Sequence, residues 1–146
     1  MVFLETAAIS GDAFGGAMLG GLLAAGIFFV FMFFLLMVGI YVYTSFAYMA
    51  IARKAKLSSP GLAWIPGIGP LIITYKASKM HWWPWLLFIG FIIPFVNFIA
   101  IIIFEVFAII WLWKTFQAVK RPGWWAIVSL IPVVNLILLG IAAWSD

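Results

Sequence analysis

The chain contains no cysteine and very little charge. Without cysteine it can form neither a disulfide bond nor a metal site with sulfur ligands, and it has no thiol nucleophile. Only 8% of its 146 residues are charged, against about 25% in an average soluble domain. So few charged side chains cannot cover the surface of a water-soluble fold of this size. The composition therefore excludes a soluble enzyme, a disordered chain and a secreted disulfide scaffold.

Candidate catalytic and metal-binding groups are equally scarce. The single histidine, His81, has no second histidine with which to build a set of three or four metal ligands. No serine has a plausible histidine–acid pair for a triad, and no glycine-rich phosphate motif follows a predicted strand. We therefore predict no catalytic residue, no metal and no cofactor, and we expect that the protein is not an enzyme.

Apolar residues dominate what is present. Hydrophobic residues make up 68% of the chain and the mean hydropathy is +1.27. Residues 13–52 carry no charge, whereas about 20 helical residues suffice to cross a hydrocarbon core of about 30 Å. We expect a first transmembrane helix over 13–52, with its spare length taken up by tilt or by protrusion. The predicted fold class is an all-α polytopic integral membrane protein, with one membrane domain over residues 1–146.

The charges predict the orientation of this domain. All eight basic residues lie in three small groups beside the apolar runs, within 53–56, 76–79 and 114–121. Cations that flank membrane segments mark the cytoplasmic side, and Glu5 and Asp12 precede the first apolar run. We therefore expect a cell-membrane protein with its N-terminus outside and its basic loops in the cytoplasm. Small clusters beside apolar runs argue against nucleic acid as a partner, despite the net charge of +4.

The rest of the chain is broken by proline and glycine. Residues 57–75 contain three of each and have basic residues at both ends, which predicts a re-entrant or interfacial element. Residues 80–117 are divided at Pro94, and equal charge at both ends favours a helical hairpin over one long kinked helix. Residues 122–145 are predicted to form a terminal helical segment broken at Pro132.

An internal repeat connects these broken segments. Two copies share a pattern of proline, nine residues, proline, two residues and asparagine, at an offset of 38 positions, and a shortened third copy ends in glycine. The copies are Pro84, Pro94 and Asn97; Pro122, Pro132 and Asn135; and Pro60, Pro66 and Gly69. We interpret the first proline as a helix start, the second as a break and the asparagine as the N-cap of the next helix. The alternative is a broken-helix site whose helix N-terminus faces an anion or a lipid carboxylate.

Tryptophans accompany each copy, and those beside the prolines are candidate interfacial anchors: Trp82, Trp83, Trp85, Trp124 and Trp125. Together with the Ile-Pro-x-x-Asn elements, this order over residues 51–143 resembles a family of small uncharacterised prokaryotic multi-pass membrane proteins. Family members carry such repeats after one N-terminal helix, and some are joined to other membrane proteins, including signal-peptidase-type chains. The resemblance implies an accessory role and no catalytic residues. Related chains have Tyr-Asn after the first Ile-Pro, where this chain has Gly67-Ile68-Gly69-Pro70.

Two further features complete the candidate sites. Gly16, Gly20 and Ala24, with Gly21 one face over, have the spacing that lets membrane helices approach closely, within the chain or with a partner. Glu105 is the one acid in a long apolar run, so it should face the protein interior or be neutralised. With Asn97 and Asn135 it forms a candidate intramembrane polar site.

The leading functional hypothesis is a small non-enzymatic membrane protein that acts as a structural or accessory subunit through intramembrane helix packing. Such a protein would be a homo-oligomer or part of a larger membrane complex in the lipid bilayer. The alternative is a small channel or transporter with a broken-helix site near Glu105, Asn97 and Asn135. A membrane enzyme that processes lipids is the least favoured hypothesis.

Overall fold

The computed structural model describes residues 1–145, and it describes the side chains of all of these except residues 7–9. Every regular element in the described part is helical, which confirms the predicted all-α class. Helices α1 and α4 are long and apolar enough to cross a membrane. In chain order the elements are α1 (Val2–Lys54), η1 (Pro60–Trp64), α2 (Gly69–Ser78), η2 (Trp83–Leu86), α3 (Leu87–Gly90), α4 (Val96–Ala118), α5 (Trp125–Val128) and α6 (Pro132–Trp144).

The chain divides into two units, and the division lies inside α1 after Ile40. The first unit is a single helix, and among its residues with described exposure only Gly15 and Ile40 are partly covered. Its exposed residues include large apolar side chains such as Phe28, Leu22 and Ile27. The second unit begins at Tyr41 and contains the last part of α1 and all the other elements.

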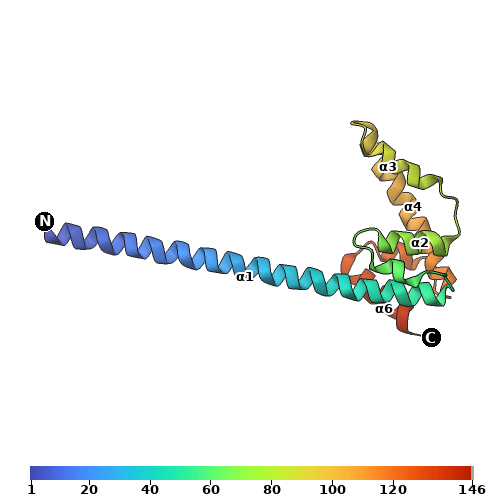
Figure 1. The fold of residues 1–146 in the computed structure, drawn as a ribbon, viewed down its shortest axis with the longest axis horizontal. Helices are drawn as coiled ribbons and strands as arrows, with labels where there is room; N and C mark the ends of the chain where they lie inside the picture. The colour runs from blue at the N-terminus through green and yellow to red at the C-terminus, as the bar shows by residue number, and fades with distance from the viewer. Residues whose placement is uncertain (146) are drawn as a thin grey trace. The chain divides into compact units, whose positions relative to one another are not determined.

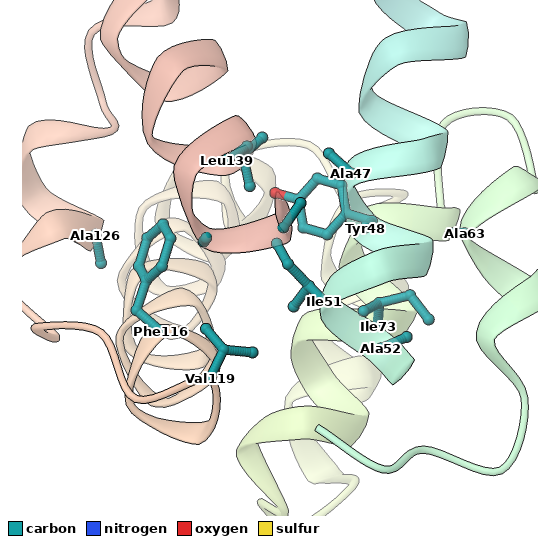
Figure 2. Close-up of a cluster of buried hydrophobic side chains, with 12 residues drawn as sticks. Ala47, Tyr48, Ile51, Ala52, Ala63, Ile73, Phe116, Val119, Ala126 and Leu139 are labelled. Atoms are coloured by element: carbon teal, nitrogen blue, oxygen red, sulfur yellow. The ribbon is translucent and has the colours of Figure 1, made fainter. Parts of the chain in front are cut away.

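The second unit has a hydrophobic core to which α1, η1, α2, α4, α5 and α6 contribute. Ile51 of α1, Ile73 of α2, Phe116 of α4 and Leu139 of α6 are almost fully buried. Figure 2 shows these side chains converging, with Tyr48 reaching from α1 toward α6. The core also contains Val119 and the alanines at 47, 52, 63, 126, 142 and 143. The small alanine side chains let the helices approach closely.

The segment after α1 doubles back along that helix. The Tyr41 hydroxyl donates a hydrogen bond to the backbone carbonyl of Trp64, and the Trp64 ring packs edge-on to Phe46 at 4.9 Å. Tyr41 lies about 20 Å along the helix axis from Lys54, at about 1.5 Å per residue. The chain therefore returns over that distance before α2 begins. Gly67, at φ +78°, makes the turn between η1 and α2 in a conformation that other residues rarely adopt.

Residues 83–90 pack antiparallel to the first half of α4. Trp83 contacts Phe107 at 4.8 Å between ring centroids, and Phe88 contacts Phe104 at 5.0 Å. Closer to the turn between α3 and α4, Gly90 faces Ala100, as expected when two consecutive segments run antiparallel. Figure 1 shows α3 lying along α4. This first arm is short and partly 3-10 because proline and glycine interrupt it.

The same backbone hydrogen bond recurs at all three Ile-Pro elements. The amide of the fifth residue donates to the isoleucine carbonyl: Gly69 to Ile65 at 2.8 Å, Asn97 to Ile93 at 2.9 Å, and Asn135 to Ile131 at 2.8 Å. The single-turn helices α3 and α5 also lie 38 positions apart, as do the two full copies of the repeat. The copies therefore share this hydrogen bond, although α6 begins at its proline and α4 begins two residues after Pro94.

The predicted capping role of the asparagines is wrong. The residues at the N-cap positions of α4 and α6 are Phe95 and Ile131, and neither helix has a side-chain cap. Pro132 is the first residue of α6, so it opens the helix where its missing N–H costs nothing. Asn97 consequently lies two positions beyond the N-cap of α4, and Asn135 lies four positions beyond the N-cap of α6.

Three basic groups coincide with helix C-termini. Lys56, Lys79 and Lys120 follow α1, α2 and α4, and each adopts a left-handed conformation with φ between 52° and 60°. At the end of α1, the Leu57 amide donates to the Ala52 carbonyl at 2.9 Å, which closes a Schellman motif. Glycine usually occupies the left-handed position of this motif, which is Lys56 here. Lysine here places a positive charge beside the negative end of the helix dipole.

Candidate functional site

A cavity of about 270 Å³ lies within the second unit, and its polar lining residues come from five parts of the fold. Tyr48 belongs to α1, Thr74 to α2, Glu105 to α4 and Asn135 to α6, while Ser129 directly follows α5. The remaining wall is apolar, with leucine, isoleucine, alanine and proline side chains. The cavity is thus an apolar pocket with a few convergent polar groups, the usual form of a small-ligand site.

The two small hydroxyl groups of the cavity donate to the backbone. Thr74 Oγ1 lies 3.0 Å from the carbonyls of both Pro70 and Leu71, one turn earlier in α2. Ser129 Oγ donates to the Ala126 carbonyl at 2.8 Å. A hydroxyl has one hydrogen and two lone pairs, so both oxygens retain the capacity to accept.

Glu105 is exposed rather than buried. Of the two alternatives predicted for it, burial in the protein interior is therefore wrong, and neutralisation stays a prediction. It lines the cavity from a helix whose neighbouring residues, such as Ile101 and Val106, are exposed. No ion pair or hydrogen bond to its carboxylate occurs within the described part of the chain. The carboxylate therefore stands at the boundary between the cavity and the apolar outer surface of α4.

The two asparagines of the repeat have different surroundings. Asn135 lines the cavity, and its Oδ1 atom is buried with no hydrogen-bond partner among the described residues. Asn97 does not line the cavity; it lies in the first turn of α4, about 12 Å along the helix axis from Glu105. The structure thus brings together two of the three predicted polar residues.

The candidate interfacial tryptophans also divide into two groups. Trp82, Trp83 and Trp124 are exposed, as an anchor at a membrane surface would be. Trp85 is half-buried and stacks on the buried Trp111 at 5.8 Å. Trp125 is half-buried against the core and packs edge-on to Phe116 at 5.9 Å. Trp85 and Trp125 therefore contribute to internal packing. Their partners lie in α4, so the local sequence around each tryptophan could not reveal this role.

The small-residue stripe of α1 is Gly16, Gly20, Ala24 and Gly21. A Cβ atom built on Gly16, Gly20 or Gly21 would meet no heavy atom within 4 Å, and Ala24 is exposed. Among the described residues, this stripe therefore makes no internal helix contact.

Two basic side chains act at the C-terminal end of α6. Lys54 Nζ donates to the carbonyls of Ala142 at 3.1 Å and Ser145 at 2.6 Å. Arg121 donates to the Ser145 carbonyl at 2.8 Å and also to its hydroxyl oxygen. Both cations donate to carbonyls at the end of this helix, and their positive charges interact favourably with the negative end of its dipole. Part of the basic charge thus stabilises the fold.

Sequence reasoning missed three residues of the cavity. These residues are Tyr48, Thr74 and Ser129, each of which carries a hydroxyl group. The available signal was a hydroxyl group in a strongly apolar run, but such groups commonly bond to the backbone of their own helix. Searches of protein-family models, curated proteins and solved structures found no match to the chain.

Proposed function

We propose that the chain is a small, non-enzymatic integral membrane protein that acts as a structural or accessory subunit through helix packing within the bilayer. The observation that carries this proposal is the exposure of large apolar side chains around the first unit of α1, such as Phe28, Phe29 and Val30. A helix that is apolar on every side is stable in lipid or against other helices, but not in water. The resemblance to the prokaryotic repeat family fits the same role.

The proposed topology is multi-pass, with the N-terminus outside the cell membrane and the basic helix ends in the cytoplasm. Its support is that α1, α2 and α4 all end at basic groups, with a lysine at each terminus. Residues 57–75 return along α1 before α2 ends, as a re-entrant element would. Residues 80–117 supply the short and long arms of the proposed hairpin.

Single-cysteine labelling tests this topology. The chain has no native cysteine, so Lys56→Cys, Lys79→Cys and Thr6→Cys each introduce a unique thiol. We expect a membrane-impermeant maleimide to label positions 56 and 79 only after the cytoplasmic side is opened, and position 6 in intact cells. Labelling of positions 56 and 79 from opposite sides would refute the re-entrant proposal. Full extraction of the chain by alkaline carbonate would refute its integral membrane location.

The proposed partner surface is the small-residue stripe of Gly16, Gly20 and Ala24 on α1, which would contact a second copy or a larger complex. Its support is that these positions are exposed and that small residues permit close helix contact in lipid. Gly20→Leu should lower the mass of the complex in mild detergent. Gly26→Leu, on a different face of the same helix, should leave it unchanged. Equal masses for all three proteins, or an equal loss in both variants, would refute this surface.

A second candidate function is a small channel or transporter. The specific observation in its favour is that Glu105 and Asn135 line one cavity. In proteoliposomes, Glu105→Gln should then abolish pH-dependent ion flux, whereas it should leave a purely structural subunit assembled. The glutamate at position 5, outside the cavity, provides the control variant Glu5→Gln. An absence of flux from the unaltered protein, or flux unaffected by Glu105→Gln, would refute this candidate.

A further inference from the structure

We propose that the cavity lined by Tyr48, Thr74, Glu105, Ser129 and Asn135 binds one small monovalent cation, either an alkali metal ion or a primary ammonium ion. The proposal rests on the second candidate function, because it names the ligand of the same site. Binding does not require transport, however, so the two can fail separately.

The oxygen atoms of the cavity are mostly acceptors. The hydroxyl hydrogens of Thr74 and Ser129 are directed at backbone carbonyls within their own helical turns. These two hydroxyl groups can therefore act only as acceptors toward a ligand, through the lone pairs of their oxygens. The buried Oδ1 of Asn135 adds a further acceptor, to which no group in the described part of the chain donates.

The donors of the cavity are fewer than its acceptors. As donors the lining offers only the hydroxyl of Tyr48 and the amide NH₂ of Asn135. As acceptors it offers two carboxylate oxygens and the four side-chain oxygens of Tyr48, Thr74, Ser129 and Asn135. No lysine, arginine or histidine lines this cavity, and Glu105 has no ion-pair partner within residues 1–145. A carboxylate in apolar surroundings requires a counter-charge or a proton. The site therefore lacks a positive charge.

The ligand class follows from this count. One carboxylate matches one positive charge, and oxygen ligands suit hard cations. No cluster of three or more histidine, aspartate or glutamate side chains occurs among the described residues, so a transition metal has no ligand set here. The carboxylate repels an anion. A sodium or potassium ion with some of its water, or a primary ammonium with three N–H donors, satisfies the oxygens that lack a donor.

The repeat supplies a matched pair of variants. Asn97 and Asn135 occupy the same position in the two full copies and make the same backbone hydrogen bond. Only Asn135 lines the cavity. Asn135→Leu therefore removes a proposed ligand, while Asn97→Leu makes the same chemical change outside the site. Thr74→Val removes a second proposed ligand with almost no change of shape.

Protection of Glu105 from a carbodiimide measures occupancy of the site. Dicyclohexylcarbodiimide is apolar and adds to protonated carboxyl groups, and Glu105 is exposed enough to meet it. The full-length protein in detergent is treated in sodium, methylammonium or tetraethylammonium chloride. Labelling is measured by mass spectrometry as the loss of the unmodified Glu105 peptide, because methylamine converts the activated carboxyl group to an amide in place of the carbodiimide adduct. Tetraethylammonium has the same charge but no N–H, and its ethyl groups shield the nitrogen from the oxygens. Glu105→Gln establishes the background.

We expect labelling in tetraethylammonium and concentration-dependent protection by sodium or methylammonium. Protection by sodium alone assigns a metal ion, and protection by methylammonium alone assigns an amine; either result supports the site. Asn135→Leu or Thr74→Val should raise the half-protecting concentration about tenfold, since one ligand to a charged group is lost. Asn97→Leu should not change it.

The proposal is overturned by equal labelling in all three salts, by no labelling of Glu105 in any salt, or by equal effects of Asn135→Leu and Asn97→Leu. Protection without flux in proteoliposomes keeps the cation site and removes the transport function. Flux without protection removes the cation site as described here.

Discussion

Gly69 offers the sharpest test of the packing of η1 against the start of α2. A Cβ atom at this position would lie 2.5 Å from the Ala63 carbonyl oxygen and 2.8 Å from the Leu62 carbonyl oxygen. Both neighbours are backbone atoms of η1, so no side-chain rotation can relieve the clash. Gly69→Ala must therefore push η1 away from the start of α2.

The expected cost follows from overpacking, which destabilises a core by about 1–3 kcal/mol. The intrinsic gain of alanine over glycine in a helix, at most about 1 kcal/mol, offsets part of this cost. We expect a net loss of about 1–2 kcal/mol in the free energy of unfolding, measured by denaturant titration in detergent with tryptophan fluorescence as the signal.

Gly61→Ala is the matched control, because a Cβ atom on Gly61 meets nothing within 4 Å. It should leave the unfolding midpoint unchanged or slightly raised. Equal stability of Gly69→Ala and the unaltered protein would refute the close approach of η1 to α2. An equal loss in both variants would assign the effect to the loop rather than to this contact.

Two further predictions concern the core and the end of α6. Leu139→Ala should cost about 2–5 kcal/mol because the side chain is almost fully buried, whereas Ile137→Ala, on the exposed face of the same helix, should cost far less. Both are measured by the same titration, and similar losses would contradict the assigned core face. Lys54→Met should lose about 1–2 kcal/mol with its hydrogen bonds to the carbonyls of Ala142 and Ser145, while Lys114→Met should be neutral. A Lys54→Met variant with the same free energy of unfolding as the unaltered protein would contradict the capping role.

The breaks in the helices were predictable because proline and glycine act locally. Pro132 lacks the N–H that a continuing helix needs, so a boundary near it is required by covalent structure. The Ile-Pro elements at 65, 93 and 131 likewise repeat one hydrogen bond because that bond spans only five residues. The sequence did not reveal that the asparagines lie past the cap, since Phe95 takes the N-cap position of α4 and Ile131 that of α6.

The sequence by itself determined the helical class and the apolar character of the chain, because backbone hydrogen bonds and hydropathy depend on neighbouring residues and composition. Only the tertiary structure decided which polar groups meet. Asn97 and Asn135 are equivalent in sequence, yet Asn135 shares a cavity with Glu105 and Asn97 does not. That difference depends on how α4 and α6 pack against α1 and α2, and so on contacts between residues far apart in the chain.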